Sequence, residues 1–379
     1  MATLVQKCNR HNLQECIERI FLELNVDPRG LVFIKPNFSA REYTRESENS
    51  DPQFLHELAS FLVNRKCQVV IGHRSNLGTK DMAFPFERII KAARLDLNKK
   101  FKNVAVVDLD KESTFVRKVH EASFHVPEIL QKADYYINLA KLKTHMQTGV
   151  TLSLKNQMGL LPANERKGMH KDSHLEKHIA YLGKAISPTI SIVEGIVAME
   201  GNGPHHGRDK RLNIVLAGDD MVELDSLATS IMGFDYKRIR HICVAASIGA
   251  GKLVDDGTVR LNRGFMAHLK PPTKHMRLGT SLYVWPTDAC PGCLKALEEA
   301  GKQLKKNPLD ALRFLKNCYT SRQDIVLGNC EGLDAGAMKP VAGFGRCAKQ
   351  YCISNNIRHL DGCPLASEDI RRFLKELFK

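Results

Sequence analysis

The chain has 379 residues, 43% of them hydrophobic and 26% charged, and its 56 Lys and Arg against 42 Asp and Glu give a net charge of +14. This length favours two domains, and the ordinary globular composition excludes disordered, collagen-like and coiled-coil chains. No apolar run approaches the roughly 18 residues of a membrane span, and residues 1–10 are too polar for a signal peptide, so we expect a cytoplasmic protein.

Short β-branched runs alternate with amphipathic helices along the first part of the chain. The predicted strands are 31–34, 67–71, 104–109, 135–139, 189–193 and 213–217, and the predicted helices are 12–24, 54–63, 86–95, 174–185 and 224–232. This alternation is typical of a mainly parallel, Rossmann-like sheet with helices on both faces. Asn12 and Glu15 predict a capping box for the first helix, and Asp220 is predicted to cap the last one.

A polar, basic segment with two consecutive prolines, residues 258–277, predicts a domain boundary. We therefore expect a large α/β domain over residues 1–270 and a smaller C-terminal α/β domain, rich in cysteine, over residues 278–379. The small domain is predicted to hold strands at 281–284, 324–327 and near Val341, and helices at 294–304, 309–315 and 367–378.

Seven of the eleven cysteines lie between Cys290 and Cys363. Cys290 and Cys293 form a Cys-x2-Cys pair after a strand, Cys347 follows another strand, and Cys363 precedes the closing helix. In a reducing compartment such thiols bind metals more often than they form disulfides, and neighbouring loops can bring them together. We predict one 4Fe–4S cluster held by Cys290, Cys293, Cys347 and Cys363.

Other interpretations of the cysteines are open. Cys330 and Cys352 are reserve ligands, Cys318 is predicted to lie in the core, and the cysteine count allows a second cluster. A structural zinc site also takes four thiolates, but usually as two close pairs, and this chain has one such pair. With zinc, the protein would be a non-redox binding or scaffold protein. The simplest alternative is a redox pair with buried thiols elsewhere.

Cationic and amide side chains follow the ends of several predicted strands, where parallel sheets bind ligands. These residues are Lys35, Asn37, Lys141, Lys143, His145, Lys155 and Asn156, with Asn202 in a glycine-rich loop. Adjacent cationic clusters of this kind bind carboxylate or phosphate groups, so we predict a site for a small anionic substrate. A solvated basic rim is the alternative. His145 is the predicted acid or base, with Lys143 beside it, because the reference pKa of histidine lies near neutrality.

The net positive charge does not by itself identify the partner. The basic residues are spread along the chain without a block of five or more, so we do not expect nucleic acid as the partner. His170, His174 and His178 would share one face if residues 169–182 formed a single helix, as metal ligands or as a polar face.

Several motifs in the first 250 residues resemble the markers of domain-of-unknown-function family 362. They occur in the family's order: Lys35-Pro-Asn37, residues 138–145, Ser153 to Gly159, Glu200-Gly-Asn-Gly-Pro204, and Asp220 with Asp225. The resemblance implies an iron–sulfur protein, and many members carry a ferredoxin-type module. The cysteines here instead follow a dispersed pattern ending in Gly-Cys-Pro.

The family is also distantly similar to the nickel-pincer lactate racemases, which have two α/β domains with the active site between them. The resemblance names no reaction for this chain. Together, the motifs and the cysteines predict an iron–sulfur oxidoreductase or electron-transfer protein that acts on a small anionic organic substrate and exchanges electrons with a redox partner protein.

Overall fold

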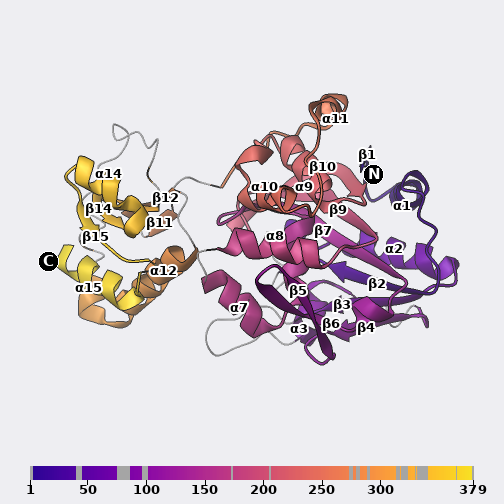
Figure 1. Cartoon of the computed structure of the whole chain (residues 1–379), viewed down its shortest axis with the longest axis horizontal. Helices are drawn as coiled ribbons and strands as arrows, with labels where there is room; N and C mark the ends of the chain where they lie inside the picture. Colours follow the sequence, from indigo (N-terminus) through magenta and orange to yellow (C-terminus); the bar gives the residue numbers. More distant parts are fainter. Residues whose placement is uncertain are drawn as a thin grey trace. The chain divides into compact units, whose positions relative to one another are not determined.

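A computed structural model describes most of the chain (Figure 1). The described residues are 3–39, 45–74, 86–95, 101–171, 174–204, 206–272, 276–278, 282–287, 291–312, 316, 323–328, 330, 340–363 and 365–377. Two compact units divide the chain. Unit 1 comprises Met1–Lys167 and Glu176–Pro272, and unit 2 comprises Gly168–Leu175 and Thr273–Lys379.

In the described part of the chain, unit 1 is built on an eight-stranded sheet in the order β1-β10-β9-β7-β2-β3-β4, with β8 paired to β7. The bounds are β1 Thr3–Lys7, β2 Leu31–Pro36, β3 Gln68–His73, β4 Val104–Asp108, β7 Tyr135–His145, β8 Gly149–Thr151, β9 Ile190–Asn202 and β10 His206–Gly218. Strands β9, β7, β2, β3 and β4 run parallel, whereas β1, β10 and β8 pair antiparallel. The predicted α/β fold with a mainly parallel sheet is confirmed.

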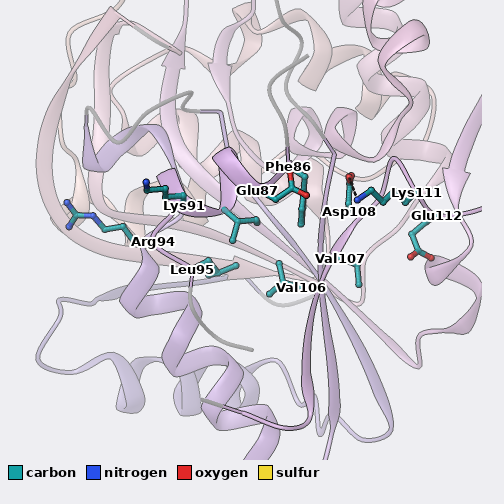
Figure 2. A pocket seen from close by; sticks show the side chains of 11 residues that line it. Phe86, Glu87, Lys91, Arg94, Leu95, Val106, Val107, Asp108, Lys111 and Glu112 are labelled. Atoms are coloured by element: carbon teal, nitrogen blue, oxygen red, sulfur yellow. Dashed lines mark ion pairs between the residues drawn. The ribbon is translucent and has the colours of Figure 1, made fainter. Parts of the chain in front are cut away.

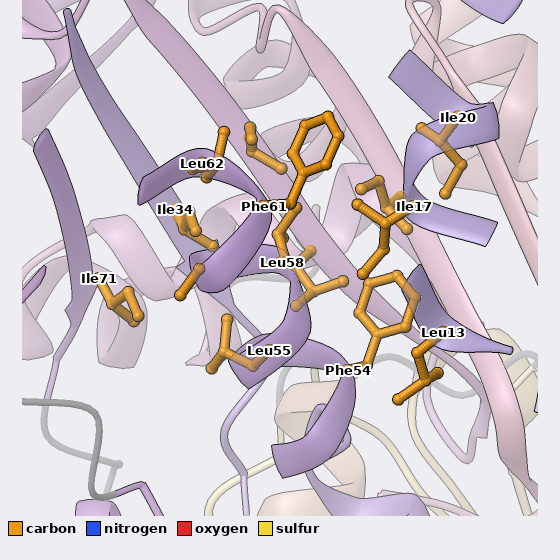
Figure 3. Packing of buried hydrophobic residues seen from close by; sticks show 14 of the residues in the cluster. Leu13, Ile17, Ile20, Ile34, Phe54, Leu55, Leu58, Phe61, Leu62 and Ile71 are labelled. Atoms are coloured by element: carbon orange, nitrogen blue, oxygen red, sulfur yellow. The ribbon is translucent and has the colours of Figure 1, made fainter. Parts of the chain in front are cut away.

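Helices α1 (Leu13–Glu23), α2 (Pro52–Asn64) and α3 (Phe86–Ala92) pack on one face of this sheet. Figure 3 shows the apolar side chains of α1 and α2 gathered against Ile34 and Ile71 of the strands. Strand residues alternate between the two faces. Ile137 therefore joins this core, whereas the next residue, Asn138, turns to the other face and contacts α6 (Ser153–Asn156) and α9 (Met221–Ile231).

The remaining elements of this part of the chain are short. They are a two-stranded sheet of β5 (Thr114–Val119) and β6 (Ala122–Pro127), helices α5 (Ile129–Lys132), α7 (Ala163–Lys171), α8 (Leu175–Ala185), α10 (Arg240–Ser247) and α11 (Asp256–Leu261), and the 3-10 turns η1 (Glu46–Glu48), η2 (Gln157–Leu160), η3 (Tyr236–Arg238) and η4 (Arg263–Phe265). Every described helix is too short or too polar to cross a lipid bilayer.

Unit 2 contains a second sheet in the order β11-β12-β13-β14-β15. Its bounds are β11 Met276–Leu278, β12 Leu282–Thr287, β13 Gln323–Gly328, β14 Pro340–Phe344 and β15 Arg358–Leu360, with α12 (Pro291–Lys306), η6 (Arg346–Ala348), α14 (Lys349–Ser354) and α15 (Ser367–Leu377). Strands β12 to β15 run parallel and β11 pairs antiparallel. The smaller C-terminal α/β unit is therefore also confirmed.

Local predictions at helix ends had mixed outcomes. Asp220 caps α9 as predicted, because its carboxylate accepts hydrogen bonds from the backbone N–H groups of Val222 (2.7 Å) and Glu223 (3.1 Å). The capping box at Asn12 is wrong, because Asn12 Oδ1 accepts a hydrogen bond from the preceding Asn9 N–H and makes no side-chain cap to α1. The three spaced histidines do not share one helix either, since α7 ends at Lys171 and α8 begins at Leu175.

Candidate functional site

Lys143 lies near the carboxyl end of β7 and is 1% exposed. Its ammonium donates hydrogen bonds to Asn37 Oδ1 (2.7 Å), Ser39 Oγ (2.9 Å) and the carbonyl oxygen of Glu48 (3.1 Å). All three acceptors are uncharged. Burial, followed by repulsion from Lys155, Lys141 and Lys35, lowers the pKa of Lys143 to about 7, and the negative charge of Glu48 opposes this shift only in part. The geometry therefore holds an ammonium at the sheet edge that an anion would stabilise.

A chain of side-chain amides joins this lysine to two neighbouring elements. Asn37 Nδ2 donates to Asn156 Oδ1 at 3.0 Å, and Asn156 Nδ2 donates to Asn138 Oδ1 at 2.7 Å. These bonds connect the end of β2 with α6 and β7, and Lys155 precedes Asn156 in α6. Burial lowers the pKa of Lys155 to about 8. Four of the predicted site residues are thus brought together at one edge of the sheet, namely Asn37, Lys143, Lys155 and Asn156.

Asp225 of α9 holds the short helix α6 in place, and the predicted site did not include it. Its carboxylate accepts hydrogen bonds from the backbone N–H groups of Ser153 (2.8 Å) and Leu154 (2.9 Å) and from Ser153 Oγ (2.5 Å). Burial raises the pKa of Asp225 to about 7, although these hydrogen bonds oppose the shift. The Asp220-x4-Asp225 motif is the sequence signal that could have identified it.

Lys35 occupies a second buried position beside this network. Its ammonium donates to the carbonyl oxygen of Pro36 at 2.6 Å and lies 3.3 Å from His73 Nδ1. A Cβ added to Gly159 would lie 2.8 Å from Lys35 Nζ, so a glycine at this position leaves room for the ammonium. Burial and the positive charge of Arg166 lower the pKa of Lys35 to about 7.

Two buried arginines that the sequence did not predict lie near Lys35. Arg74 follows β3 and donates from Nε to the carbonyl oxygen of Leu160 (2.7 Å) and from Nη1 to Asp110 Oδ1 (3.0 Å). Arg166 comes from α7, and burial lowers its pKa to about 10, with Asp110 opposing the shift and Arg74 adding to it. Arg74 directly follows β3, much as Lys35 lies near the end of β2. The sequence predicted that this strand ends at residue 71, so Arg74 was not recognised as a residue at a strand end. Arg166 carries no such signal.

Two of the predicted residues have protein partners of their own. Lys141 forms an ion pair with Glu194 of β9, with 2.5 Å between Nζ and Oε2 and both side chains fully buried. This carboxylate already neutralises Lys141. His145 Nδ1 accepts hydrogen bonds from the backbone N–H groups of Gln147 (3.1 Å) and Thr148 (3.4 Å), which fixes its ring.

Asn202 lies at the end of β9, in a turn that packs against β7. Thr144 Oγ1 donates to the carbonyl oxygen of Gly201 (2.7 Å), and Met146 N–H donates to that of Gly203 (3.0 Å). A Cβ on Gly203 would overlap the carbonyl oxygen of Thr144. At Gly203, therefore, glycine is needed for the close approach of two backbone segments.

Three of the predicted cluster ligands, Cys293 in the first turn of α12, Cys347 in η6 and Cys363 before α15, follow the carboxyl ends of parallel strands of unit 2. Cys293 follows β12 and is buried, whereas Cys347 and Cys363 follow β14 and β15 and are exposed. Cys293 Sγ lies 3.5 Å from the position of a Cβ on Gly345, and the carbonyl oxygen of Gly362 lies 4.0 Å from the same point. Gly345 therefore lies against Cys293, and Gly362 lies beside Gly345, where its carbonyl oxygen accepts a hydrogen bond from Arg346 N–H at 2.9 Å. Cys290 and Cys318 lie outside the described residues.

Cys330 and Cys352 belong to a different part of the core. They form a small buried cluster with Val326 and Ala348, separate from the cluster that contains Cys293. Burial raises the pKa of Cys352 to about 11. Among the described residues, which do not include Cys290, no group of three or more His, Cys, Asp or Glu side chains is arranged to hold a metal.

The sequence matches the family model described as domain of unknown function (DUF362) over residues 32–230, which is more than half of the chain. This chain belongs to the DUF362 family. The DUF362 match includes the residues of unit 1 that form the lysine and amide network, from Lys35 to Asp225, and ends before the cysteine loops of unit 2.

Two known proteins resemble this DUF362 chain. The thylakoid-associated protein sll1697 of Synechocystis sp. (strain ATCC 27184 / PCC 6803 / Kazusa) is 34% identical over 122 residues, which are 31% of this chain and 38% of that protein. The chain thus matches well under half the length of this curated relative. The lactate racemase apoprotein from Thermoanaerobacterium thermosaccharolyticum aligns with 99% of this chain and 81% of its own, at 10% identity and a TM-score of 0.40.

A hollow of about 780 Å³ lies between α3 and β4 of the DUF362 protein (Figure 2). Its lining includes Lys91 of α3, Arg94 in the turn after that helix, and Val106 and Asp108 of β4. None of the predicted site residues lines it. The segments 75–85 and 96–100, which adjoin α3 in the sequence, lie outside the described residues.

Proposed function

We propose that this DUF362 protein binds a small organic anion at the buried lysines of unit 1. We further propose that it is an iron–sulfur oxidoreductase or electron-transfer protein whose cluster is held by the cysteine loops of unit 2. The observation that carries the first part is Lys143, a buried ammonium with three uncharged hydrogen-bond acceptors. Burying a charge is costly unless it is paired, and a carboxylate or phosphate on the ligand would pair it.

Lys143 is also the group that we propose for proton transfer. A general acid or base works best when its pKa lies near the working pH, and burial brings the pKa of Lys143 to about 7. His145 suits this role less well. Because its Nδ1 accepts two backbone hydrogen bonds, the neutral ring carries its proton on Nε2 and has no basic nitrogen to offer there. Lys143, by contrast, can exchange a proton.

Four cysteines would hold the cluster: Cys290, Cys293, Cys347 and Cys363. Three features of the described cysteines suit it: exposed thiols at Cys347 and Cys363, a glycine, Gly345, next to Cys293 Sγ, and positions beyond parallel strands. Backbone N–H groups at such glycines can offset the negative charge of thiolates. When bound, the cluster would supply one-electron transfer, which requires a redox partner protein.

Ligand binding tests the anion site. Isothermal titration of the full chain with a panel of small organic acids and their phosphate esters should reveal binding that Lys143→Met weakens about 10- to 100-fold, the expected loss of one charge-assisted hydrogen bond. The matched control is Lys118→Met, since Lys118 is exposed on β5. Equal affinity of Lys143→Met and the wild type would refute the anion site.

Metal analysis tests the cluster. Anaerobically purified protein should contain about four irons and four acid-labile sulfides per chain, with a visible absorption band that dithionite bleaches. Cys363→Ser should lower the iron content, whereas Cys243→Ser in unit 1 should not. About one zinc without sulfide would overturn the redox proposal and leave a binding protein with a structural metal site.

A further inference from the structure

We infer that His241 and Thr151 form a neutral subsite of unit 1, beside Lys155, that binds an uncharged hydroxyl group of the ligand. This inference rests on the proposed anion binding at Lys143 and narrows the ligand to an organic acid that also carries a hydroxyl group. Neither His241 nor Thr151 belongs to the site residues that the sequence predicted.

His241 of α10 is a buried imidazole whose polar atoms lack partners. Its side chain is 0% exposed, and neither Nδ1 nor Nε2 has a hydrogen-bond partner among the described residues. Burial, followed by the positive charge of Lys155, lowers the pKa of His241 to about 3, so the ring is neutral near pH 7. A neutral imidazole has one N–H donor and one acceptor nitrogen, and leaving both unpaired in the interior is costly.

Thr151 of β8 is a second buried group of this kind. Its Oγ1 is buried and makes no hydrogen bond within the described part of the chain. The register of the sheet sets Thr151 directly opposite Lys143 of β7. Directly opposite side chains lie on the same face, with Cβ atoms about 4.5–5.5 Å apart. The unpaired hydroxyl therefore lies next to the lysine of the proposed anion site.

Packing brings His241 to the same region. Ile239, two residues before His241, contacts β8, since a Cβ added to Gly149 would lie 2.7 Å from Ile239 Cδ1. Helix α6 follows β8 and carries Lys155, whose charge acts on both His241 and Lys143. Lys155 is partly exposed, whereas His241 is buried, so we place the entrance for the ligand on the side of Lys155.

The chemistry of these groups favours a hydroxyl over a second anionic group. A carboxylate only accepts hydrogen bonds, so it would leave the acceptor nitrogen of the neutral ring without a donor. A hydroxyl can donate to that nitrogen and accept from Thr151 Oγ1. The lysines then supply the positive charge for the carboxylate of the same ligand. Because Lys143 and Thr151 are direct cross-strand neighbours, only a few bonds should separate the carboxylate from the hydroxyl.

Titration calorimetry of the full chain with matched acids tests the subsite. Each pair compares an acid with its terminally hydroxylated analogue: acetate with glycolate, propionate with 3-hydroxypropionate, and butyrate with 4-hydroxybutyrate. In at least one pair the hydroxyl should tighten binding about 10-fold, the effect of one hydrogen bond to a buried group. Thr151→Val and His241→Leu should each reduce this preference to less than about 2-fold. Lys143→Met should weaken binding of both acids of the pair and keep the preference.

Urea unfolding of the variants adds a measurement that needs no ligand. Because Thr151 Oγ1 has no partner, Thr151→Val should not lower the urea concentration at the unfolding midpoint. A midpoint lower by more than about 0.5 M would mean that the hydroxyl is already paired within the protein, and would overturn the subsite. His11→Leu is the control for His241→Leu in the titrations, since His11 is exposed, and it should keep the preference of the wild type.

The outcomes separate this subsite from the proposed function. If the wild type binds acids without preferring the hydroxylated member of any pair, the subsite is refuted and the Lys143 site stands. The same holds if the preference persists in both Thr151→Val and His241→Leu, or if a phosphate ester binds and no acid of the pairs does so up to about 10 mM. If no anion binds at all, the proposed function fails and the subsite fails with it. Should His241→Leu not fold, Thr151→Val decides alone, since valine keeps the shape of threonine.

Discussion

Removing Lys141 tests how the interior of unit 1 tolerates an unpaired carboxylate. Lys141 and Glu194 are both fully buried and pair at 2.5 Å. In Lys141→Met, Glu194 would keep two donors, the backbone N–H groups of Ile196 (2.8 Å) and Asp51 (3.2 Å). Losing one partner of a buried ion pair costs about 3–5 kcal/mol. Because these two donors remain, we expect a loss near the lower end, about 3 kcal/mol in the free energy of unfolding.

Urea unfolding followed by far-ultraviolet circular dichroism measures this loss. Tryptophan fluorescence is unsuitable, because the chain has one tryptophan, Trp285, and it lies in unit 2. Lys132→Met is the matched control, since Lys132 pairs with Glu128 at 3.2 Å with side chains 64% and 37% exposed. That exposed pair should contribute at most about 0.5 kcal/mol.

The loss of stability in Lys141→Met should also depend on pH in a direction that the structure predicts. Burial raises the pKa of Glu194 above its ordinary value, and removing Lys141 raises it further. The folded variant then holds a proton that the unfolded chain has lost, so its stability falls as pH rises above about 4.5. The loss caused by Lys141→Met should be smaller at pH 5 than at pH 8. A loss below about 1 kcal/mol at pH 8, or equal losses at both pH values, would refute the buried ion pair.

Three further predictions follow from the buried groups. The pKa of Lys35 and Lys143 falls from 10.5 to about 7 on folding, so the unfolded chain binds more protons between these two pH values. The free energy of unfolding in urea should therefore rise from pH 7 to pH 10, and a flat profile would contradict the lowered pKa values. Asp225→Ala removes three hydrogen bonds and should destabilise unit 1 by about 2–4 kcal/mol in urea unfolding. The variant should also bind anions more weakly, and unchanged anion binding would show that Asp225 does not support the site. Gly343→Ala places a methyl group against Cys352 Sγ and should destabilise unit 2 by about 1–3 kcal/mol, measured by tryptophan fluorescence. The double variant that also carries Cys352→Ala should recover part of this stability, and no recovery would mean that the clash lies elsewhere.

The position of residues at strand ends could be predicted from the sequence, because parallel strands deliver their carboxyl ends to one edge of the sheet. Lys35, Asn37, Lys143 and Asn156 meet there through the register of β2 and β7, which sets Lys35 opposite Asn138. The charge state of each lysine could not be predicted in this way.

The difference between the lysines depends on cross-strand pairing. Register places Lys141 directly opposite Glu194 of β9, 53 residues later in the chain, whereas Lys143 receives uncharged acceptors. Arg166 and Asp225 likewise reach the site through tertiary packing, which no local spacing encodes. The capping box predicted at Asn12 failed for a related reason. Its side chain accepts a hydrogen bond from the residue three positions before it instead of capping the helix.

The contact between Asp225 and α6 also sets the order in which a growing chain can complete its site. Ser153 and Asp225 are 72 residues apart, so at about 5–20 residues per second the ribosome needs about 4 to 14 s to travel from one to the other. During that interval, the turn that carries Lys155 and Asn156 lacks the carboxylate that holds its backbone N–H groups. The support of α6 is therefore completed late in synthesis, and a chain that stops before Asp225 would carry Lys155 and Asn156 without it.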